Sequence, residues 1–415
     1  MSTRCRLSGK PLTEVVDLGD LYVSNFYPTV DLDAPRAPLR LGIGEESGLL
    51  QLMDPFERPP LYHQYWYRSG TNETMSRQLN DVVTAFREWV HLRPRDIVLD
   101  IGCNDGTLLS HVPRSLDVMR IGIDPAENIA ESARAVCDAH SVAFFSKDRF
   151  MDLSGGRKAR VITSIAMFYG VDDPKAFVMD IANCLSDDGV WVLQLSYTPL
   201  MIKQNAFDNI CHEHIQYYTL LSLKYLLDQA ELEIIDVEFN DTNAGSFRII
   251  SCKKGQGDRF GTMFLRDIGH YRVQSTLAYE RQQRFDEPQI YRDYMERING
   301  LKATTLELLD GLKHDGKRVL GYGASTKGNT LLQFYGLGPD MIEGIAERQP
   351  HKYGLYTAGS WIPIISEDEM RSREPDYLFV LPWHFMTEFY EREAAFVGGG
   401  GQFIVPLPAL QIVGQ

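Results

Sequence analysis

The sequence predicts an α/β protein in which a small β-rich module precedes two larger α/β units. Strand-like runs alternate with helix-like runs over the middle of the chain, which is the pattern of a parallel sheet covered by helices. A second strand, glycine-rich turn and helix begins in the C-terminal third. At 415 residues the chain is also too long for one hydrophobic core. We therefore expect three domains, at residues 1–75, 76–285 and 286–415.

The N-terminal module is distinguished by its proline and glycine content. Residues 1–75 contain short apolar runs such as LLQLMDP and show little helical periodicity. Short apolar runs bounded by turn residues are typical of strands. We expect a small module rich in β-structure.

The two α/β units follow in order. The central unit begins with a helical apolar stripe in TMSRQLNDVVTAFREWV, and the later runs EIIDVEFN and SFRIISCKK look like two closing strands. A long charged segment with helical spacing, 269–313, connects this unit to the next. The C-terminal unit opens with VLGYGASTKGNTLLQFY and continues with strand-like runs. This order predicts a second α/β domain of similar architecture.

Composition excludes several classes of partner. Apolar residues make up 44% of the chain, but no stretch approaches the ~18 uninterrupted apolar residues that a membrane helix requires. The formal charge is −14 and no block of basic residues occurs, so we expect no nucleic-acid partner. The N-terminus lacks an apolar segment behind its basic residues, so we expect a cytoplasmic protein. The six cysteines form no C-x-x-C pair, which favours reduced thiols.

The first glycine-rich turn follows a strand that ends at Asp100. It contains Gly102, Asn104 and Gly106 before a helix, and the next strand ends at Asp124. Glycines let the backbone approach a ligand closely at the carboxyl end of a strand. The spacing D-x-G-x-x-x-G resembles the first motif of class I S-adenosylmethionine-dependent methyltransferases, in which the second acid binds both ribose hydroxyls. The cofactor expected from this likeness is S-adenosyl-L-methionine, and the alternative is a turn used only for close packing.

The second glycine-rich turn has a weaker pattern. Gly321, Gly323 and Gly328 follow a strand, and Glu347 ends the next strand. The third glycine falls late for the G-x-G-x-x-G pattern of dinucleotide sites, and Lys327 near the helix start suits a phosphate. Three interpretations stay open: a nicotinamide site, contact with a substrate phosphate, and a pure scaffold.

The stretch DNICHEHIQYYTL, 208–220, concentrates polar and aromatic residues. His212 and His214 are two apart, so a metal pair is conceivable, but helix-borne zinc sites favour i, i+4 spacing and no further ligands are near. One histidine could be a general base oriented by Glu213 or a tyrosine. The remaining interpretation is a hydrogen-bonded polar cluster at a domain boundary. Because the stretch follows the strand and loop VWVLQLSYTP on the cofactor side of the sheet, it can face the methyl group.

Over nearly its whole length the chain resembles the nucleotide-sugar C-methyltransferases, which methylate carbon 3 or sometimes carbon 5 of a 4-keto sugar. The likeness rests on VVDLGDLYVSNFYP, YWYRSGTNETM, LDIGCNDGTLL, the H-E-H stretch, YGASTKGN, KYGLYTAGSWIPI and PDYLFVLPWHF. It implies an N-terminal zinc module, a class I methyltransferase (Rossmann-like) central domain and a C-terminal Rossmann-like α/β domain. The nucleotide sugar is expected between the last two, in a monomer or homodimer.

The resemblance also implies roles for individual residues. His214 is the expected base, with Glu213 and His212 in the same motif, and it would generate an enolate beside the ketone without a metal. Tyr65 or Tyr67 is expected to reach the site. Further expected substrate contacts are Asn209, Cys211, Tyr322, Ser325, Lys327, Asn329 and Lys352, with the two lysines as candidates for the diphosphate.

Three departures from the family pattern stand out. Of the four zinc thiols only Cys5 is present, because Ser8, Gly44 and Ser47 occupy the other positions, so we expect a metal-free module. Cys211 replaces a tyrosine that commonly precedes H-E-H. A GGS turn reads NAGS here, 243–246. These changes suggest a different keto sugar or a related nucleotide-linked compound.

Two other functions are carried as alternatives. A nicotinamide-dependent oxidoreductase would use the second glycine-rich turn. A sugar-nucleotide-binding protein without catalysis would account for the lost zinc ligands and the missing tyrosine.

Overall fold

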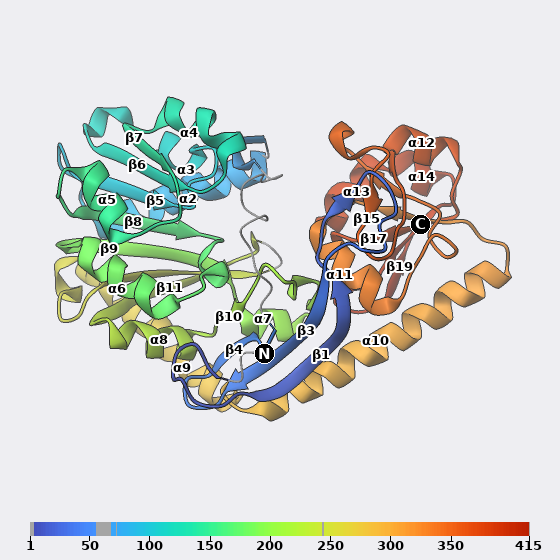
Figure 1. Cartoon of the computed structure of the whole chain (residues 1–415), viewed down its shortest axis with the longest axis horizontal. Coiled ribbons are helices and arrows are strands. Elements are labelled where there is room, and N and C mark those ends of the chain that lie inside the picture. The colour runs from blue at the N-terminus through green and yellow to red at the C-terminus, as the bar shows by residue number, and fades with distance from the viewer. Residues whose placement is uncertain (1–3, 55–67, 72, 243–244, 415) are drawn as a thin grey trace.

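The computed structural model describes residues 4–54, 68–71, 73–242 and 245–414. Figure 1 shows two α/β units side by side, with the N-terminal strands and the long helix α10 (Pro288–His314) extending beneath both. Tyr65 and Tyr67, the two tyrosines expected near the site, lie outside the described residues.

The central unit contains a seven-stranded sheet in the order β11-β12-β9-β8-β5-β6-β7. Neighbouring strands from β9 to β7 are parallel, whereas β12 is antiparallel to both β9 and β11. The five residues of β5 are all buried and apolar neighbours cover both faces, which is typical of parallel strands. Its strands are β5 (Ile97–Ile101), β6 (Met119–Asp124), β7 (Ala139–Val142), β8 (Ala159–Ile165), β9 (Leu185–Ser196), β11 (Leu232–Asn240) and β12 (Ser246–Lys253).

Helices pack around this sheet, and the predicted N-terminal stripe forms one of them. Helix α2 buries Leu79, Val82, Val83, Phe86 and Trp89, which recur at spacings of three and four. The helices of this unit are α2 (Glu73–Trp89), α3 (Thr107–Ser110), α4 (Ala130–Val136), α5 (Lys147–Ser154), α6 (Pro174–Cys184), α7 (Thr198–Lys203), α8 (Leu220–Gln229) and α9 (Met263–Gln282).

The N-terminal strands form a four-stranded sheet that includes a strand from the central unit. The order is β1-β3-β4-β10, with β1 (Thr13–Tyr22), β3 (Arg36–Gly44), β4 (Leu49–Leu52) and β10 (Gln216–Tyr217). Strand β10 follows the H-E-H stretch directly and pairs antiparallel with β4. The H-E-H stretch is therefore held against the N-terminal sheet.

The C-terminal unit contains a six-stranded sheet in the order β16-β14-β13-β17-β18-β19. Its strands are β13 (Val319–Tyr322), β14 (Ile345–Glu347), β16 (Ile364–Ser366), β17 (Tyr377–Val380), β18 (Gln402–Val405) and β19 (Gln411–Val413). Its helices are α11 (Thr326–Tyr335), α12 (Glu367–Ser372), α13 (Met386–Arg392) and α14 (Ala394–Gly398). Two short strands, β2 (Phe26–Tyr27) and β15 (Tyr356–Thr357), pair and join this unit to the N-terminal strands.

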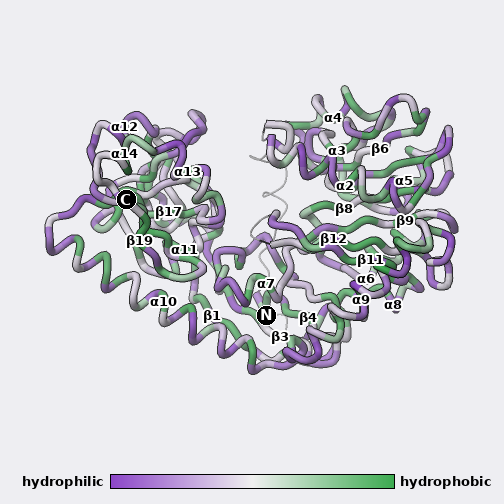
Figure 2. The backbone as a smooth tube through the Cα atoms, turned by 180° about the vertical axis from the view of Figure 1, so that it is seen from behind, coloured by the Kyte–Doolittle hydropathy of each residue, from purple (hydrophilic) through white to green (hydrophobic). Residues whose placement is uncertain are grey.

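One apolar core combines residues from distant parts of the chain. One buried cluster joins Leu39 and Leu41 of β3 to Tyr291 of α10 and to Leu320 of β13. Figure 2 shows apolar residues concentrated along the strands of both sheets, while α10 alternates between polar and apolar faces. Among the described helices, none combines the length and the apolar character that crossing a lipid bilayer requires.

Candidate functional site

The first glycine-rich turn connects β5 to α3 at the carboxyl end of the sheet. Gly102 has φ 72°, and a side chain there would bring its Cβ within 3.0 Å of Met167 Cγ. Gly106 has φ 83° and lies against α4, where an added Cβ would be 3.2 Å from Val136 Cβ. Both positions therefore need glycine, one to keep the turn open near Met167 and the other to pack two helices.

Two buried carboxyl groups support this turn. The Asp124 carboxylate accepts the backbone N–H of Asn104 at 2.9 Å and that of Ala126 at 2.8 Å. Burial raises the pKa of Asp124, and these two amides oppose the rise. Each carboxylate oxygen keeps a further lone pair, so the group can still accept ribose hydroxyls. Asp124 and the open turn thus suit the cofactor predicted from the sequence.

Asp100 lies deeper than Asp124 and does not face open solvent. Its Oδ1 accepts the hydroxyl of Thr163 at 2.6 Å, and only 3% of the residue is exposed. Burial raises the pKa of Asp100 to about 7, with the Thr163 hydroxyl opposing the rise and the Asp124 charge adding to it. Asp100 is therefore poised to respond to a positive charge placed nearby.

A pocket lies next to this turn, at the carboxyl ends of β8 and β9. In the sheet, β8 lies between β5 and β9, so the pocket is adjacent to the strand that carries the turn. The short helix η4 (Phe168–Gly170) follows β8 and begins directly after Met167, the residue that contacts Gly102. The pocket is lined by Tyr169, Leu195, Ser196, Thr198, Met201, Asn209, His214, Gln216, Tyr217 and Tyr218.

His214 is fixed in this pocket by a backbone carbonyl and an aromatic ring. Its Nδ1 lies 3.0 Å from the carbonyl oxygen of Asn209, in the short helix η5 (Phe207–Asn209). Because a carbonyl oxygen only accepts, Nδ1 carries the proton and the neutral ring has its lone pair on Nε2. The Tyr169 ring packs against the imidazole at 4.1 Å between centroids. This is the tautomer that a general base at Nε2 requires.

Several polar atoms of the pocket have no hydrogen-bond partner among the described residues. They are Thr198 Oγ1, Asn209 Oδ1, Gln216 Oε1 and the Tyr218 hydroxyl, and all four are buried. A buried polar atom left without a partner costs ~1–3 kcal/mol. Four such atoms on residues that line one pocket make it a candidate site for a polar ligand.

The other histidine of the motif is not among the residues that line the pocket, and its expected catalytic role stays a prediction. His212 is 2% exposed, and its Nε2 donates to the carbonyl oxygen of Ala37 in β3 at 3.0 Å. Burial lowers its pKa. His212 therefore anchors the motif to the N-terminal sheet, while Glu213 is partly exposed beside it.

Cys211 is buried at the edge of the pocket, next to a tyrosine. Its backbone N–H donates to the Tyr217 hydroxyl at 3.3 Å. Burial and the nearby Glu213 charge raise the pKa of the Cys211 thiol to about 12. The thiol is therefore neutral, and the Tyr217 phenol lies beside the backbone of this residue.

The second glycine-rich turn is filled by the protein's own side chains. A Cβ at Gly323 would lie 2.5 Å from Pro382 Cγ, and one at Gly321 would lie 2.7 Å from Ile345 Cγ1. A Cβ at Gly328 would lie 3.0 Å from Leu381 Cβ. Close packing accounts for all three glycines, so nothing here favours a dinucleotide.

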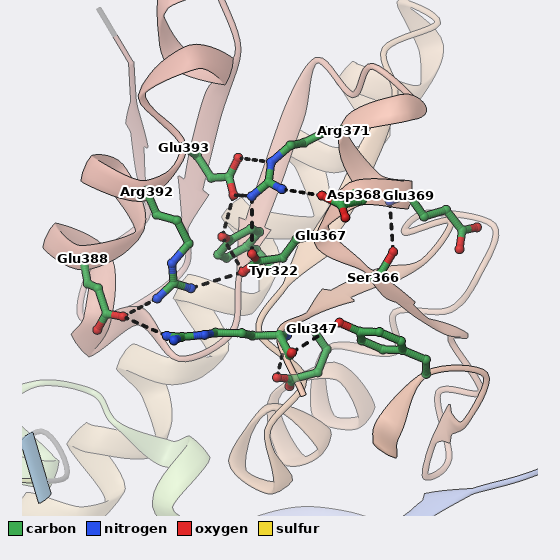
Figure 3. Close-up of polar contacts among 12 residues, drawn as sticks. Tyr322, Glu347, Ser366, Glu367, Asp368, Glu369, Arg371, Glu388, Arg392 and Glu393 are labelled. Atoms are coloured by element: carbon green, nitrogen blue, oxygen red, sulfur yellow. Dashed lines mark hydrogen bonds and ion pairs between the residues drawn. The ribbon is translucent and has the colours of Figure 1, made fainter. Parts of the chain in front are cut away.

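The hydroxyl of Tyr322, a residue expected near the substrate, lies in a charged network of the C-terminal unit (Figure 3), and the expected substrate contact stays a prediction. The hydroxyl lies 2.8 Å from Glu393 Oε1 and 3.0 Å from Glu367 Oε1. Glu393 also accepts two hydrogen bonds from Arg371, at 3.0 and 2.6 Å. Burial and these carboxylates raise the pKa of Tyr322. The network is satisfied internally.

Lys352 and Ser325 are also occupied by contacts within the fold. Lys352 Nζ donates to the Ala324 carbonyl at 2.8 Å and lies 3.2 Å from Glu347 Oε2, so its charge is paired. The Ser325 hydroxyl caps α11 by accepting the N–H of Gly328 at 3.0 Å. Neither contact favours the substrate roles expected for Lys352 and Ser325.

Lys327 and Asn329 lie on the first turn of α11, facing different neighbours. Burial lowers the pKa of Lys327, and the charge of Asp208 in the central unit opposes this. Asn329 is fully buried and donates from Nδ2 to the carbonyl oxygen of Asn25 at 2.9 Å. Lys327 thus faces the central unit, and Asn329 ties α11 to the N-terminal strands.

The four positions that would carry zinc thiols in the family pattern are residues 5, 8, 44 and 47, and hydrogen bonds connect several of them to their neighbours. The Cys5 thiol lies 3.1 Å from the Ser47 hydroxyl, and a Cβ on Gly44 would lie 2.7 Å from Cys5 Sγ. Ser8 accepts the N–H of Lys10 at 3.3 Å. One thiol and two hydroxyls do not match the ligands of a tetrahedral zinc ion.

Comparison with known proteins identifies the chain. A methyltransferase domain model matches residues 71–237, and a model of the C-methyltransferase C-terminal domain matches residues 241–408. The C-methyltransferase NovU of Streptomyces niveus is 29% identical over 377 residues, which is 91% of this chain and 87% of that protein. Over most of its length the chain is similar to C-methyltransferases. It is an S-adenosylmethionine-dependent enzyme, and the central unit has the class I methyltransferase fold predicted from the sequence.

Two similar solved structures each match less than half of this chain. A putative methyltransferase in complex with the Trm112 activator of Haloferax volcanii shares 15% identity, covering 45% of this chain and 94% of that one, with a TM-score of 0.37. The magnesium protoporphyrin IX methyltransferase of Synechocystis PCC 6803 shares 13% identity, covering 45% of this chain and 80% of that one, with a TM-score of 0.32. With TM-scores below 0.5, these structures add nothing to the assignment.

The pocket of the C-methyltransferase contains residues that sequence reasoning missed. Tyr169 directly follows β8, and the carboxyl end of a parallel strand was a signal that could have found it. Thr198 lies in the loop already recognised after β9. Gln216 and Tyr218 had no comparable signal, because only the fold shows that their polar atoms lack partners.

Proposed function

We propose that this C-methyltransferase acts on a nucleotide-linked 4-keto sugar and that His214 is its general base. The single observation that carries the proposal is the pocket in which His214 lies beside four buried polar atoms without partners among the described residues. A keto sugar has a carbonyl and several hydroxyls, so it can satisfy acceptors and donors together. The resemblance to nucleotide-sugar enzymes agrees with this chemistry.

The proposed reaction begins at the imidazole of His214. Nε2 removes the proton from the carbon beside the ketone, because Nδ1 is held protonated by the Asn209 carbonyl. The ordinary pKa of an imidazole lies near neutrality, which suits removal of such a proton. S-adenosylmethionine, held by the turn at Gly102 and by Asp124, supplies an electrophilic methyl group on a sulfonium.

Hydroxyl donors of the pocket stabilise the enolate that this step creates. Thr198 and Tyr218 each have a hydroxyl without another partner among the described residues, so each can donate to the developing oxyanion. Asn209 Oδ1 and Gln216 Oε1 accept hydroxyls of the sugar ring. These contacts orient one face of the sugar toward the methyl group.

The nucleotide diphosphate is assigned to the first turn of α11. This helix presents its N-terminus and Lys327 toward the central unit, and both favour an anion. Within the described residues, no carboxylate lies within 4.0 Å of the Lys327 ammonium. Lys352 is assigned no phosphate contact because it is paired with Glu347.

A methyl-transfer assay tests the substrate class. Protein is incubated with methyl-labelled S-adenosylmethionine and a panel of nucleotide-linked 4-keto deoxyhexoses, and the product is located by mass spectrometry and NMR. We expect label on a ring carbon next to the ketone. Binding of S-adenosylmethionine without transfer to any keto sugar, together with transfer to a substrate lacking a ketone, would contradict the proposal.

Matched variants locate the sugar in the pocket. Thr198→Val and Tyr218→Phe should each raise KM or lower kcat/KM about tenfold, since each removes a hydrogen bond worth ~1–1.5 kcal/mol. Tyr225→Phe is the control, because the Tyr225 hydroxyl bonds to Glu46 at 2.9 Å outside the pocket. Equal kinetics in all three variants would place the sugar elsewhere.

A further inference from the structure

The segment that carries His214 is anchored by the C-terminal unit. The indole N–H of Trp383 donates to Asp208 Oδ2 at 3.1 Å, and the Thr330 hydroxyl donates to the carbonyl oxygen of Ile210 at 3.0 Å. Trp383 follows β17, whereas Asp208 lies in η5 of the central unit. Two side chains of one domain thus hold the short turn that precedes the base of the other.

Asp208 is a buried acidic residue, which is unusual in a contact between two domains. It is 2% exposed, and its Oδ1 has no hydrogen-bond partner among the described residues. Burial raises the pKa of its carboxyl group, while the charge of Lys327, the Trp383 indole and two backbone N–H groups of η5 oppose the rise. These groups oppose the cost of burying the carboxyl without removing the rise in its pKa, so its place in the turn calls for an explanation beyond packing.

The position of Asp208 in the turn supplies that explanation. The next residue is Asn209, whose carbonyl oxygen accepts Nδ1–H of His214 at 3.0 Å. Any movement of Asp208 therefore moves the acceptor that selects the tautomer of His214. The Trp383 indole is the donor from the other domain that keeps Asp208 in place.

We propose that Trp383 and Asp208 are a positioning pair through which the C-terminal unit sets the tautomer and orientation of His214. The inference rests on the proposed function for the role of His214 as a base. Neither residue is catalytic, because both act through the Asn209 carbonyl. The pair would couple binding of the diphosphate to the orientation of His214. The reason is that Lys327, the proposed diphosphate contact, also acts on the Asp208 carboxyl.

The tautomer can be read without any sugar substrate. Protein labelled with ¹⁵N-histidine is saturated with S-adenosylmethionine, and the imidazole signals of His214 are assigned by their loss in His214→Ala. We expect the protonated nitrogen to be Nδ1 in the wild type and a mixture of tautomers in Trp383→Phe. Trp361→Phe is the matched control, because Trp361 packs against Tyr22 and Tyr27 away from η5 and should leave the signals unchanged.

Two variants of the carboxyl group keep the test decisive if Trp383→Phe folds poorly. Asp208→Asn retains an oxygen that accepts the indole N–H and should preserve the Nδ1 tautomer, whereas Asp208→Ala should not. With a substrate in hand, Trp383→Phe and Asp208→Ala should lower kcat at least tenfold and change KM less than threefold, with kcat partly restored in Asp208→Asn.

The outcomes separate this inference from the proposed function. If folded Trp383→Phe and Asp208→Ala keep the wild-type tautomer and the wild-type pH profile of kcat, the positioning role is wrong even if His214 is the base. If the tautomer changes in these variants but His214→Ala still transfers methyl groups at the wild-type rate, the positioning role holds and the assignment of the base is wrong.

Discussion

The two α/β units each place a glycine-rich turn and an acidic residue at the carboxyl ends of two neighbouring strands, but the glycines and the acid of the two units have different neighbours. In the central unit, Asp124 accepts two backbone N–H groups and keeps lone pairs for a ligand. In the C-terminal unit, Glu347 is paired with Lys352, and Pro382 covers Gly323. The same local pattern thus leaves an acid able to accept further hydrogen bonds in one unit and pairs the acid with a lysine in the other.

The polar groups around the two turns differ in the same way. Beside the central turn, Thr198 and Tyr218 lack partners among the described residues. Beside the C-terminal turn, Tyr322 and Glu393 are hydrogen-bonded to one another (Figure 3). Unsatisfied buried polar atoms also occur near the C-terminal turn, at Asn329 and His384, so they favour a ligand only where they belong to residues that line a pocket, as around His214.

The largest expected effect separates the polar groups of the two units. His214→Ala should lower kcat for methyl transfer about 10³-fold, because a general base contributes ~10²–10⁴-fold. Tyr322→Phe should leave kcat within about threefold and destabilise the fold by ~1–3 kcal/mol, because Glu393 and Glu367 lose one of their hydrogen-bond donors. Steady-state kinetics and denaturant unfolding measure the two effects. A large loss of kcat in Tyr322→Phe, with little loss in His214→Ala, would contradict this difference between the two units.

The glycines provide the next contrast. Gly323→Ala combines a φ of 84° with overlap against Pro382, so we expect a loss of ~2–5 kcal/mol in unfolding free energy with unchanged affinity for S-adenosylmethionine. Gly102→Ala meets only the flexible Met167 side chain, so it should cost less stability and weaken the cofactor at least tenfold. Denaturant titration measures the unfolding free energy of each variant, and calorimetry measures its affinity for S-adenosylmethionine. Weaker cofactor binding in Gly323→Ala alone would reverse the roles of the two turns.

The acids should differ in what their removal affects. Asp124→Asn should raise the Kd for S-adenosylmethionine about 10–100-fold, because one charged acceptor for the ribose is lost. Glu347→Gln should leave that Kd unchanged and lower stability by ~1–3 kcal/mol, since Lys352 loses its buried partner. Calorimetry on both variants measures these outcomes, and an equal loss of cofactor affinity in the two would contradict them.

The smallest effect is on the pH dependence of stability. The folded-state pKa of Asp100 is raised from 3.8 to about 7, so in the absence of cofactor the folded protein holds a proton that the unfolded chain releases. This contribution to stability is fully present below about pH 4 and is lost progressively as the pH rises to about 7. Asp100→Asn should remove that part of the slope in urea unfolding of the cofactor-free protein. An unchanged slope would show that Asp100 titrates normally.

Local chemistry explains which features the sequence could predict. The turn at Gly102 is contiguous with its strand and helix, so residue spacing predicted it, and alternating apolar runs predicted both sheets. The separate roles of His212 and His214 were beyond sequence reasoning, because β10 pairs with β4 and turns one ring toward Ala37. The positions of residues 65 and 67 lie outside the described residues and stay a prediction.

The partners of the C-terminal candidates could not be predicted for a related reason. Tyr322 and Lys352 occupy the ends of a strand and a loop where ligands commonly bind. Their partners, Glu393 and Glu347, come from segments whose proximity follows only from the folded sheet. Whether a polar side chain is satisfied is a tertiary property, and residue spacing does not encode it.

Deuterium exchange tests the central claim, that His214 removes a proton beside a ketone, most directly. The protein is incubated in D₂O with the keto sugar and S-adenosylhomocysteine, so that proton removal is observed without methyl transfer. We predict that the wild type and His212→Gln exchange the hydrogen beside the ketone, while His214→Gln exchanges it at least 100-fold more slowly. Exchange in His214→Gln at the wild-type rate would contradict the account.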